Sequence, residues 1–238
     1  MKLDLLAIAA HPDDVELTCG GTLIKMVERG YKVGILDLTE GEMGSRGSAE
    51  IRRREAAAAA RVLGVHYRES LRLPDARLEV NEENKLAVAG KIRALRPHTV
   101  ILPYWEGRHP DHYNAARLAY EGCFLAGLKR LPLGGEAFRP FKVLYSTAYY
   151  PVRPTFAVDI TQQFERRRRA INAYASQFKP TKRERRPKVY LPLDKLQDEV
   201  HLIVRYYGQM IGVQYAEPFL VREVMQVDDV VKLPVRSI

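Results

Sequence analysis

Two short segments of the chain combine histidine and aspartate at a spacing that suits metal binding. The segments are "AHPDD" near the amino terminus and "RHPDH" in mid-chain, and their histidines and aspartates are His11, Asp13, Asp14, His109, Asp111 and His112. Two histidines and a carboxylate, with one position left open, form a ligand set typical of catalytic zinc. Residues three apart at the start of a helix can face the same way, which applies to His11 with Asp14 and to His109 with His112. The remaining polar groups exceed what a metal needs and are suited to proton transfer.

Each segment taken alone also has a structural interpretation. Aspartate is a common N-cap, so Asp13 or Asp14 alone is as well explained by the start of a helix. Two copies at two strand-to-helix turns favour a site instead. The other histidines, His66, His98 and His201, are isolated in the sequence, and we expect structural roles for them.

The elements that must position these segments alternate along the chain. Strand patterns fall at residues 3–10, 31–39, 65–73, 98–105, 141–150 and 155–161, and helical patterns at 15–29, 49–63, 82–96, 112–128, 162–176 and 195–211. This alternation predicts an α/β, Rossmann-like three-layer fold with a mostly parallel sheet. We expect one domain over residues 1–238, with a core at 1–130 that carries the metal site and a C-terminal elaboration at 131–238. The charged, proline-containing stretch 179–192 is expected to be a mobile loop.

The predicted topology brings the two segments together. In a sheet of order 3-2-1-4-5, the first and fourth strands are neighbours, and their helices depart to opposite faces. Ligands bind in the crevice that this arrangement leaves at the carboxyl ends of the strands. Both segments follow such a strand end, so we expect one shared site. The turn after the first strand lacks G-x-G-x-x-G, which argues against a dinucleotide cofactor.

Composition narrows the function classes. The chain has 238 residues, a net charge of +9 and two cysteines, Cys19 and Cys123, without C-x-x-C spacing, so we expect reduced thiols in a cytoplasmic protein. There is no secretory signal pattern, and no apolar run approaches the roughly 20 residues of a membrane span. The basic runs 166–169 and 179–188 raise the alternative of a non-catalytic module that binds nucleic acid or an anionic sugar. Four successive arginines on a helix point in different directions, so we favour a solvated surface and expect no nucleic-acid partner.

The paired motifs resemble the LmbE-like/PIG-L family of zinc-dependent N-acetylglucosamine deacetylases. Further stretches resemble its bacillithiol-pathway branch, among them "IRRREAAAAARVLGV", "LRLPD", "AYASQF" and "GVQYAEPF". The resemblance covers nearly the whole chain. It implies removal of acetate from N-acetylglucosaminyl malate, or, as in some relatives, from chitooligosaccharides or other GlcNAc compounds. It also implies a homo-oligomer, with a hexamer expected.

The resemblance further implies a role for each residue of the motifs. His11, Asp14 and His112 correspond to the metal ligands, which hold Zn²⁺, although Fe²⁺ accepts the same set. Asp13 corresponds to the general base. His109 corresponds to the group that stabilises the oxyanion, cationic if Asp111 beside it orients the ring.

Three arginines are candidates for substrate binding. Arg52 matches the family's R-x-x-E together with Glu55. Arg46 and Arg108 lie in or beside the crevice loops, where a guanidinium could bind a substrate carboxylate. The glycine-rich loop at 40–48 is expected to fold over the sugar.

Overall fold

The computed structural model describes residues 1–148, 150–178 and 193–235, and its centre is one seven-stranded sheet of order β3-β2-β1-β4-β5-β7-β6. The strands are β1 (Leu5–Ala9), β2 (Val33–Asp37), β3 (Tyr67–Ser70), β4 (Thr99–Pro103), β5 (Lys142–Ser146), β6 (Phe156–Asp159) and β7 (Ala216–Leu220). The first five pair in parallel, and β7 runs antiparallel to both of its neighbours. The predicted α/β class, the mostly parallel sheet and the order 3-2-1-4-5 are confirmed.

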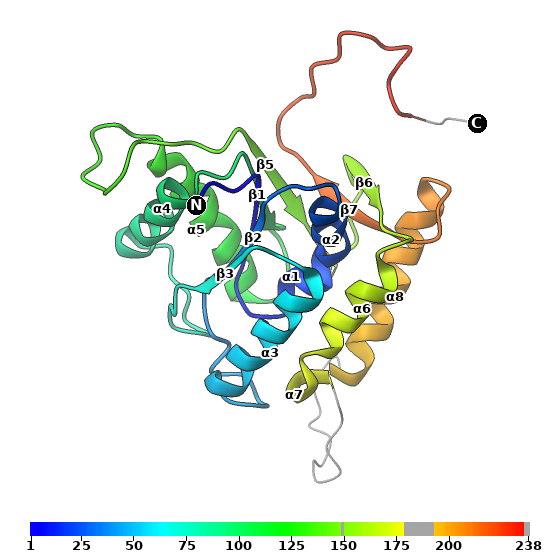
Figure 1. Ribbon diagram of the computed structural model, residues 1–238, viewed down its shortest axis with the longest axis horizontal. Helices are drawn as coiled ribbons and strands as arrows, with labels where there is room; N and C mark the ends of the chain where they lie inside the picture. Colours follow the sequence, from blue (N-terminus) through cyan, green and yellow to red (C-terminus); the bar gives the residue numbers. More distant parts are fainter. Residues whose placement is uncertain (149, 179–192, 236–238) are drawn as a thin grey trace.

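Helices cover both faces of the sheet (Figure 1). They are α1 (Asp14–Thr18), α2 (Gly20–Glu28), α3 (Ala49–Leu63), α4 (Glu82–Leu95), α5 (Pro110–Ala126), α6 (Phe164–Asn172), α7 (Ala175–Phe178) and α8 (Leu193–Met210). Helices α4 and α5 pack on one face, and α2, α3 and α6 contribute to the core on the other. This is the predicted three-layer arrangement.

Side chains of the central strands point alternately to the two faces of the sheet, so the sheet separates two hydrophobic cores. Leu6 and Ile8 of β1 belong to the core under α4 and α5, whereas Leu5, Ala7 and Ala9 belong to the opposite one. All five are buried, as expected for a parallel strand covered on both faces. The strand that delivers the first motif is therefore fixed from both sides.

The helix expected at 15–29 is interrupted at Cys19. Its backbone leaves the helical region there (φ −146°, ψ 14°), and α1 and α2 form in its place. The Glu217 carboxylate accepts hydrogen bonds from the backbone N–H groups of Gly21 and Thr22, at 2.8 and 2.7 Å. A side chain at Gly21 would lie within 3 Å of Ile160, so the close packing requires glycine.

The C-terminal half departs most from the prediction. The sequence patterns did not indicate β7, where Pro218 breaks the strand signal. The helix expected at 162–176 is divided into α6 and α7. Strands β5, β6 and β7, all beyond residue 130, belong to the same sheet as β1. The expected loop at 179–192 lies outside the described residues. Within the described ranges, the helices lack the length and apolar character needed to cross a bilayer.

Candidate active site

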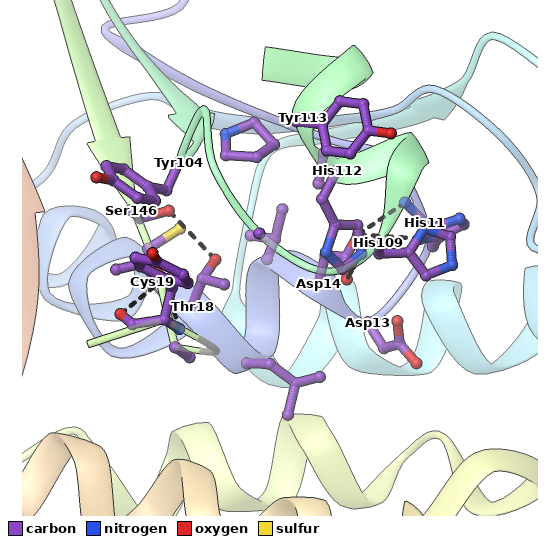
Figure 2. A pocket seen from close by; sticks show the side chains of 18 of the residues that line it. His11, Asp13, Asp14, Thr18, Cys19, Tyr104, His109, His112, Tyr113 and Ser146 are labelled. Carbon is purple, nitrogen blue, oxygen red and sulfur yellow. Dashed lines mark hydrogen bonds and ion pairs between the residues drawn. The ribbon is translucent and has the colours of Figure 1, made fainter. Parts of the chain in front are cut away.

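The two histidine- and aspartate-containing segments meet at one edge of the sheet. The segment 11–14 follows β1 and the segment 109–112 follows β4, and these strands are direct neighbours. His109 is the N-cap of α5 and Pro110 occupies its first turn, so this helix starts two residues earlier than predicted. Figure 2 shows the two segments converging on one pocket.

Three side chains form a compact set of potential metal ligands. His11 Nδ1 lies 3.3 Å from Asp14 Oδ2, and His112 Nε2 lies 3.2 Å from Asp14 Oδ1. The candidate ligand atoms of His11, Asp14 and His112 all lie within 4.8 Å of one another. Asp14 therefore stands between two imidazole nitrogens, as a metal-binding carboxylate would.

A second, overlapping set consists of His11, His109 and Asp111. Its carboxylate is already engaged, because Asp111 accepts hydrogen bonds from the backbone N–H groups of Ala76 (2.8 Å) and Leu78 (3.3 Å). The Asp14 carboxylate accepts one such bond, from the His11 backbone N–H at 3.0 Å, which leaves Oδ1 to His112, so the set that contains Asp14 is the stronger candidate for a metal site.

The outer nitrogen of His11 faces two further carboxylates. His11 Nε2 lies 3.0 Å from Asp75 Oδ1 and 3.3 Å from Asp111 Oδ2. A metal-binding histidine usually donates its second ring N–H to a carboxylate, which fixes the tautomer and the ring orientation. Asp75 and Asp111 thus leave Nδ1 of His11 directed at Asp14.

These contacts shift protonation in opposite directions. Burial opposes a charge on His11, but hydrogen bonds with Asp111, Asp14 and Asp75 outweigh it and raise the histidine pKa well above its usual value. Burial likewise opposes the charge of Asp14, yet His112 and His11 hold the Asp14 pKa well below its usual range. The site is therefore arranged around an ionised Asp14.

Asp13 is separated from this set by its backbone conformation. Asp13 is the N-cap residue of α1 with a φ of 106°, in the left-handed region, but its side chain makes no capping hydrogen bond. Its carboxylate lies 3.2 Å from Arg52 Nη2 and apart from the His11–Asp14–His112 set (Figure 2). Burial raises the pKa of Asp13 to about 7, against the opposing charge of Arg52. A carboxyl group that titrates near neutrality and is not a ligand is suited to general base catalysis.

The hydrogen-bond partner of the His109 ring differs from the one that we expected from the sequence. Its Nδ1 accepts a hydrogen bond from the backbone N–H of Asp111 at 3.2 Å, whereas the Asp111 carboxylate lies against His11. Burial, with the charges of His112 and His11, lowers the pKa of His109. The neutral ring is favoured, not the cation that the sequence suggested. Because Nδ1 is an acceptor, the proton of that neutral ring is on Nε2.

The three arginine candidates have different surroundings. Arg52 is buried, and its guanidinium contacts both Asp13 and the Pro12 carbonyl oxygen. Arg108 is among the residues that line the pocket. Arg46 donates to the Gln177 carbonyl oxygen at 3.2 Å and is absent from the described lining. The structure brings Arg52 and Arg108 to the pocket and directs Arg46 toward α7.

Asp75 is the site residue that the sequence prediction missed. It follows β3 in the stretch "LRLPD", at the same edge of the sheet as both motifs. It also accepts a hydrogen bond from the Met43 backbone N–H at 2.8 Å, which ties the loop at 40–48 to the site. The signal was its position shortly after the strand pattern at 65–73, since ligands of open α/β sheets bind outside the carboxyl ends of parallel strands.

The chain matches known proteins in both sequence and structure. Residues 6–123 match the PIG-L family, described as GlcNAc-PI de-N-acetylase. A diacetylchitobiose deacetylase of Thermococcus kodakarensis is 31% identical over 226 residues, which cover 90% of this chain and 80% of that protein. The conserved protein TT1542 of Thermus thermophilus has a TM-score of 0.85 and 41% identity, covering 95% of this chain and 98% of that one. An N,N'-diacetylchitobiose deacetylase of Pyrococcus horikoshii has a TM-score of 0.79 and 29% identity, covering 90% and 82%. The chain therefore belongs to the PIG-L family of LmbE-like deacetylases.

Proposed function

We propose that this protein is a metal-dependent hydrolase that removes the acetyl group from an N-acetylglucosamine unit of a neutral oligosaccharide such as diacetylchitobiose. The observation that carries the proposal is the division between adjacent aspartates. Asp14 lies between two histidines, whereas Asp13 is left with a raised pKa beside Arg52. A protein that only bound a sugar would have no use for this second carboxylate.

We propose zinc as the metal held by His11, Asp14 and His112. Two histidine nitrogens and a carboxylate form a donor set that zinc accepts. His11 and His112 approach different oxygens of the Asp14 carboxylate, at 3.3 and 3.2 Å, and the candidate ligand atoms of the three residues lie within 4.8 Å of one another, so the set fits one small divalent cation. Iron(II) accepts the same donor types and is the alternative. When bound, the metal would polarise the acetyl carbonyl and acidify a water molecule.

The side chains around the set have separate tasks in amide hydrolysis. Asp13 takes the proton of the attacking water and returns it to the departing glucosamine nitrogen. Arg52, in contact with Asp13, holds that carboxylate in place. His109 donates its Nε2–H to the oxygen of the tetrahedral intermediate. That donation suits the neutral ring, whose Nδ1 is already an acceptor.

The pocket favours a neutral substrate over N-acetylglucosaminyl malate, which the resemblance to the bacillithiol branch implies. A malyl group carries two carboxylates, and each needs a cation or N–H donors. The described residues that line the pocket include two arginines, Arg52 and Arg108, and no lysine. Arg52 already pairs with Asp13. The similarity to diacetylchitobiose deacetylases points the same way.

The decisive experiment is acetate release by the purified, zinc-loaded protein. The substrates are N,N'-diacetylchitobiose, N-acetylglucosamine and N-acetylglucosaminyl malate. We expect the highest kcat/KM for the disaccharide. Preference for the malate conjugate would establish the bacillithiol reaction instead, and no acetate from any GlcNAc compound would refute the proposal.

We also propose a cytoplasmic homo-oligomer that does not bind nucleic acid. Both cysteines are free and buried, which is compatible with a reducing compartment. In the arginine run of α6, Arg167 is fully buried against Glu217 and Arg166 donates to the Val62 carbonyl oxygen, so the run forms no continuous basic stripe.

Self-association has support in the segment 224–235, which runs away from the body after Arg222 packs over the Trp105 ring (Figure 1). Its apolar side chains include Val224, 98% exposed, and Val231, 90% exposed. Exposed apolar side chains that gather in one stretch of chain mark an interaction surface. Light scattering should show an oligomer that dissociates when residues 223–238 are removed. A monomeric full-length chain would contradict this proposal.

A further inference from the structure

The active-site pocket has a second end that the deacetylation chemistry does not use. The cavity measures about 1350 Å³, which exceeds the roughly 300–1,000 Å³ typical of small-molecule sites. One end holds the metal-binding set, and Figure 2 shows Tyr104, Ser146, Cys19 and Thr18 together at the other. The pocket therefore has room beyond a single N-acetylglucosamine ring.

Rigid elements build this second end. Tyr104 directly follows β4, and its backbone N–H donates to the Ser146 carbonyl oxygen at 3.0 Å. Ser146 is the last residue of β5, and its hydroxyl lies 3.3 Å from the hydroxyl of Thr18 at the end of α1. Thr147 Oγ1 accepts a hydrogen bond from the backbone N–H of Tyr150 at 3.3 Å, which fixes the start of the next loop.

Aromatic rings supply one wall of this end. The rings of Tyr104 and Tyr150 are 5.7 Å apart and inclined by 31°, and Trp105 packs 4.5 Å from Tyr104. Both tyrosines line the pocket, and Tyr150 is 41% exposed, so its ring is accessible. The negative face of an aromatic ring attracts the polarised C–H groups on the flat face of a pyranose.

Hydroxyl groups supply polar contacts at the same end of the pocket. Thr18 and Ser146 line the pocket beside Tyr104 (Figure 2), whereas the Thr147 hydroxyl is already used, because it donates to the carbonyl oxygen of Tyr150 and accepts from its N–H. A hydroxyl both donates and accepts hydrogen bonds, so it can pair with sugar hydroxyls in either sense. Carbohydrates present an apolar ring face and a polar rim, and the rings and hydroxyls at this end match those two surfaces.

We propose that Tyr104 and Tyr150 form a subsite for a second, neutral pyranose ring of the substrate, while the first ring presents its acetamide to the metal-binding set. This inference rests on the proposed function, because it assigns the position of the sugar next to the one that is deacetylated. Tyr104 and Tyr150 are then specificity-determining residues, with no part in the chemical step.

The test compares two substrates in matched variants. Tyr150→Ala should raise KM for N,N'-diacetylchitobiose about tenfold, with kcat/KM for N-acetylglucosamine unchanged. Tyr150→Phe keeps the ring and should restore the KM for the disaccharide. Tyr31→Ala removes an exposed tyrosine outside the described pocket lining and serves as the control. An equal loss on both substrates, or no loss on either, would overturn the subsite.

Binding measurements separate this inference from the proposed function. Calorimetric titration of N,N'-diacetylchitobiose into the zinc-loaded Asp13→Asn protein reports on the subsite without turnover. Adding Tyr150→Ala should weaken binding of the disaccharide and leave that of N-acetylglucosamine unaltered, and unchanged disaccharide affinity would refute the subsite. If the wild-type protein releases no acetate but the binding difference persists, the proposed reaction fails and the subsite stands.

Discussion

Asp13 and Asp14 are consecutive residues whose carboxylates face different partners. Asp14 lies 3.3 and 3.2 Å from nitrogens of His11 and His112, whereas Asp13 lies 3.2 Å from Arg52. The left-handed backbone at Asp13 separates the two side chains. One peptide unit thus joins the proposed metal ligand to the proposed general base, and the two roles can be tested independently.

The first prediction concerns this division of roles. Asp13→Asn should lower kcat/KM about 10²- to 10⁴-fold, because a proton acceptor is lost, and the bound zinc should be unchanged. Asparagine tolerates a positive φ, so the turn is preserved. Asp14→Asn is the matched comparison and should lose the metal. Atomic absorption on both proteins provides the measurement, and loss of zinc from the Asp13 variant would reverse the assignment.

The second prediction is a pH dependence. Burial raises the pKa of Asp13 to about 7, partly opposed by Arg52. A general base acts only when deprotonated, so kcat/KM should fall as pH decreases through this pKa. A bound cation stabilises the carboxylate, so the acidic limb of the loaded enzyme should lie below 7. In the metal-free protein, infrared difference spectra against Asp13→Asn should show a carboxyl group titrating near pH 7. Titration near pH 4 would disprove the raised pKa.

The third prediction concerns the carboxylate behind His11. Asp75→Asn removes the charge that faces His11 Nε2 at 3.0 Å. Loss of such an outer partner typically weakens metal affinity about 10- to 100-fold. Chelator competition gives the zinc Kd, and Asp159→Asn, on the remote strand β6, is the control. An unaltered Kd would mean that Asp111 alone orients the ring.

The fourth prediction concerns the buried ion pair of α6 and β7. Arg167 Nε lies 2.9 Å from Glu217 Oε1, and both side chains are fully buried. Glu217→Gln leaves a buried guanidinium without its counter-charge, which should cost about 3–5 kcal/mol of unfolding free energy. Arg168 pairs with Glu165 on the surface, so Arg168→Ala should cost about 0–1 kcal/mol. Urea denaturation of both variants measures the difference, and equal losses would contradict it.

The sequence predicted the part of the fold that depends on local pattern. The apolar runs of β1 and β4 and the polar turns after them were sufficient to place His11, Asp14 and His112 at one crevice. Parallel order around the first strand follows from general rules of α/β folds, so no long-range information was needed.

What the sequence did not predict depends on contacts between distant residues. The interruption at Cys19 coincides with hydrogen bonds from Gly21 and Thr22 to Glu217, nearly two hundred residues further along the chain. Asp111 was expected to orient His109, but its carboxylate is held by the backbone of the loop after β3. Side-chain direction of this kind is set by tertiary packing and leaves no periodic signal.

The contact between Glu217 and the start of α2 also constrains when the active site can mature during synthesis. The first motif leaves the ribosome early, but the carboxylate that accepts from Gly21 and Thr22 is translated about two hundred residues later. At roughly 5–20 residues per second, that interval lasts about 10–40 seconds. The nascent chain therefore carries His11 and Asp14 long before the strand that fixes the following helix exists. Tight metal capture should be a late event, coupled to the docking of β7.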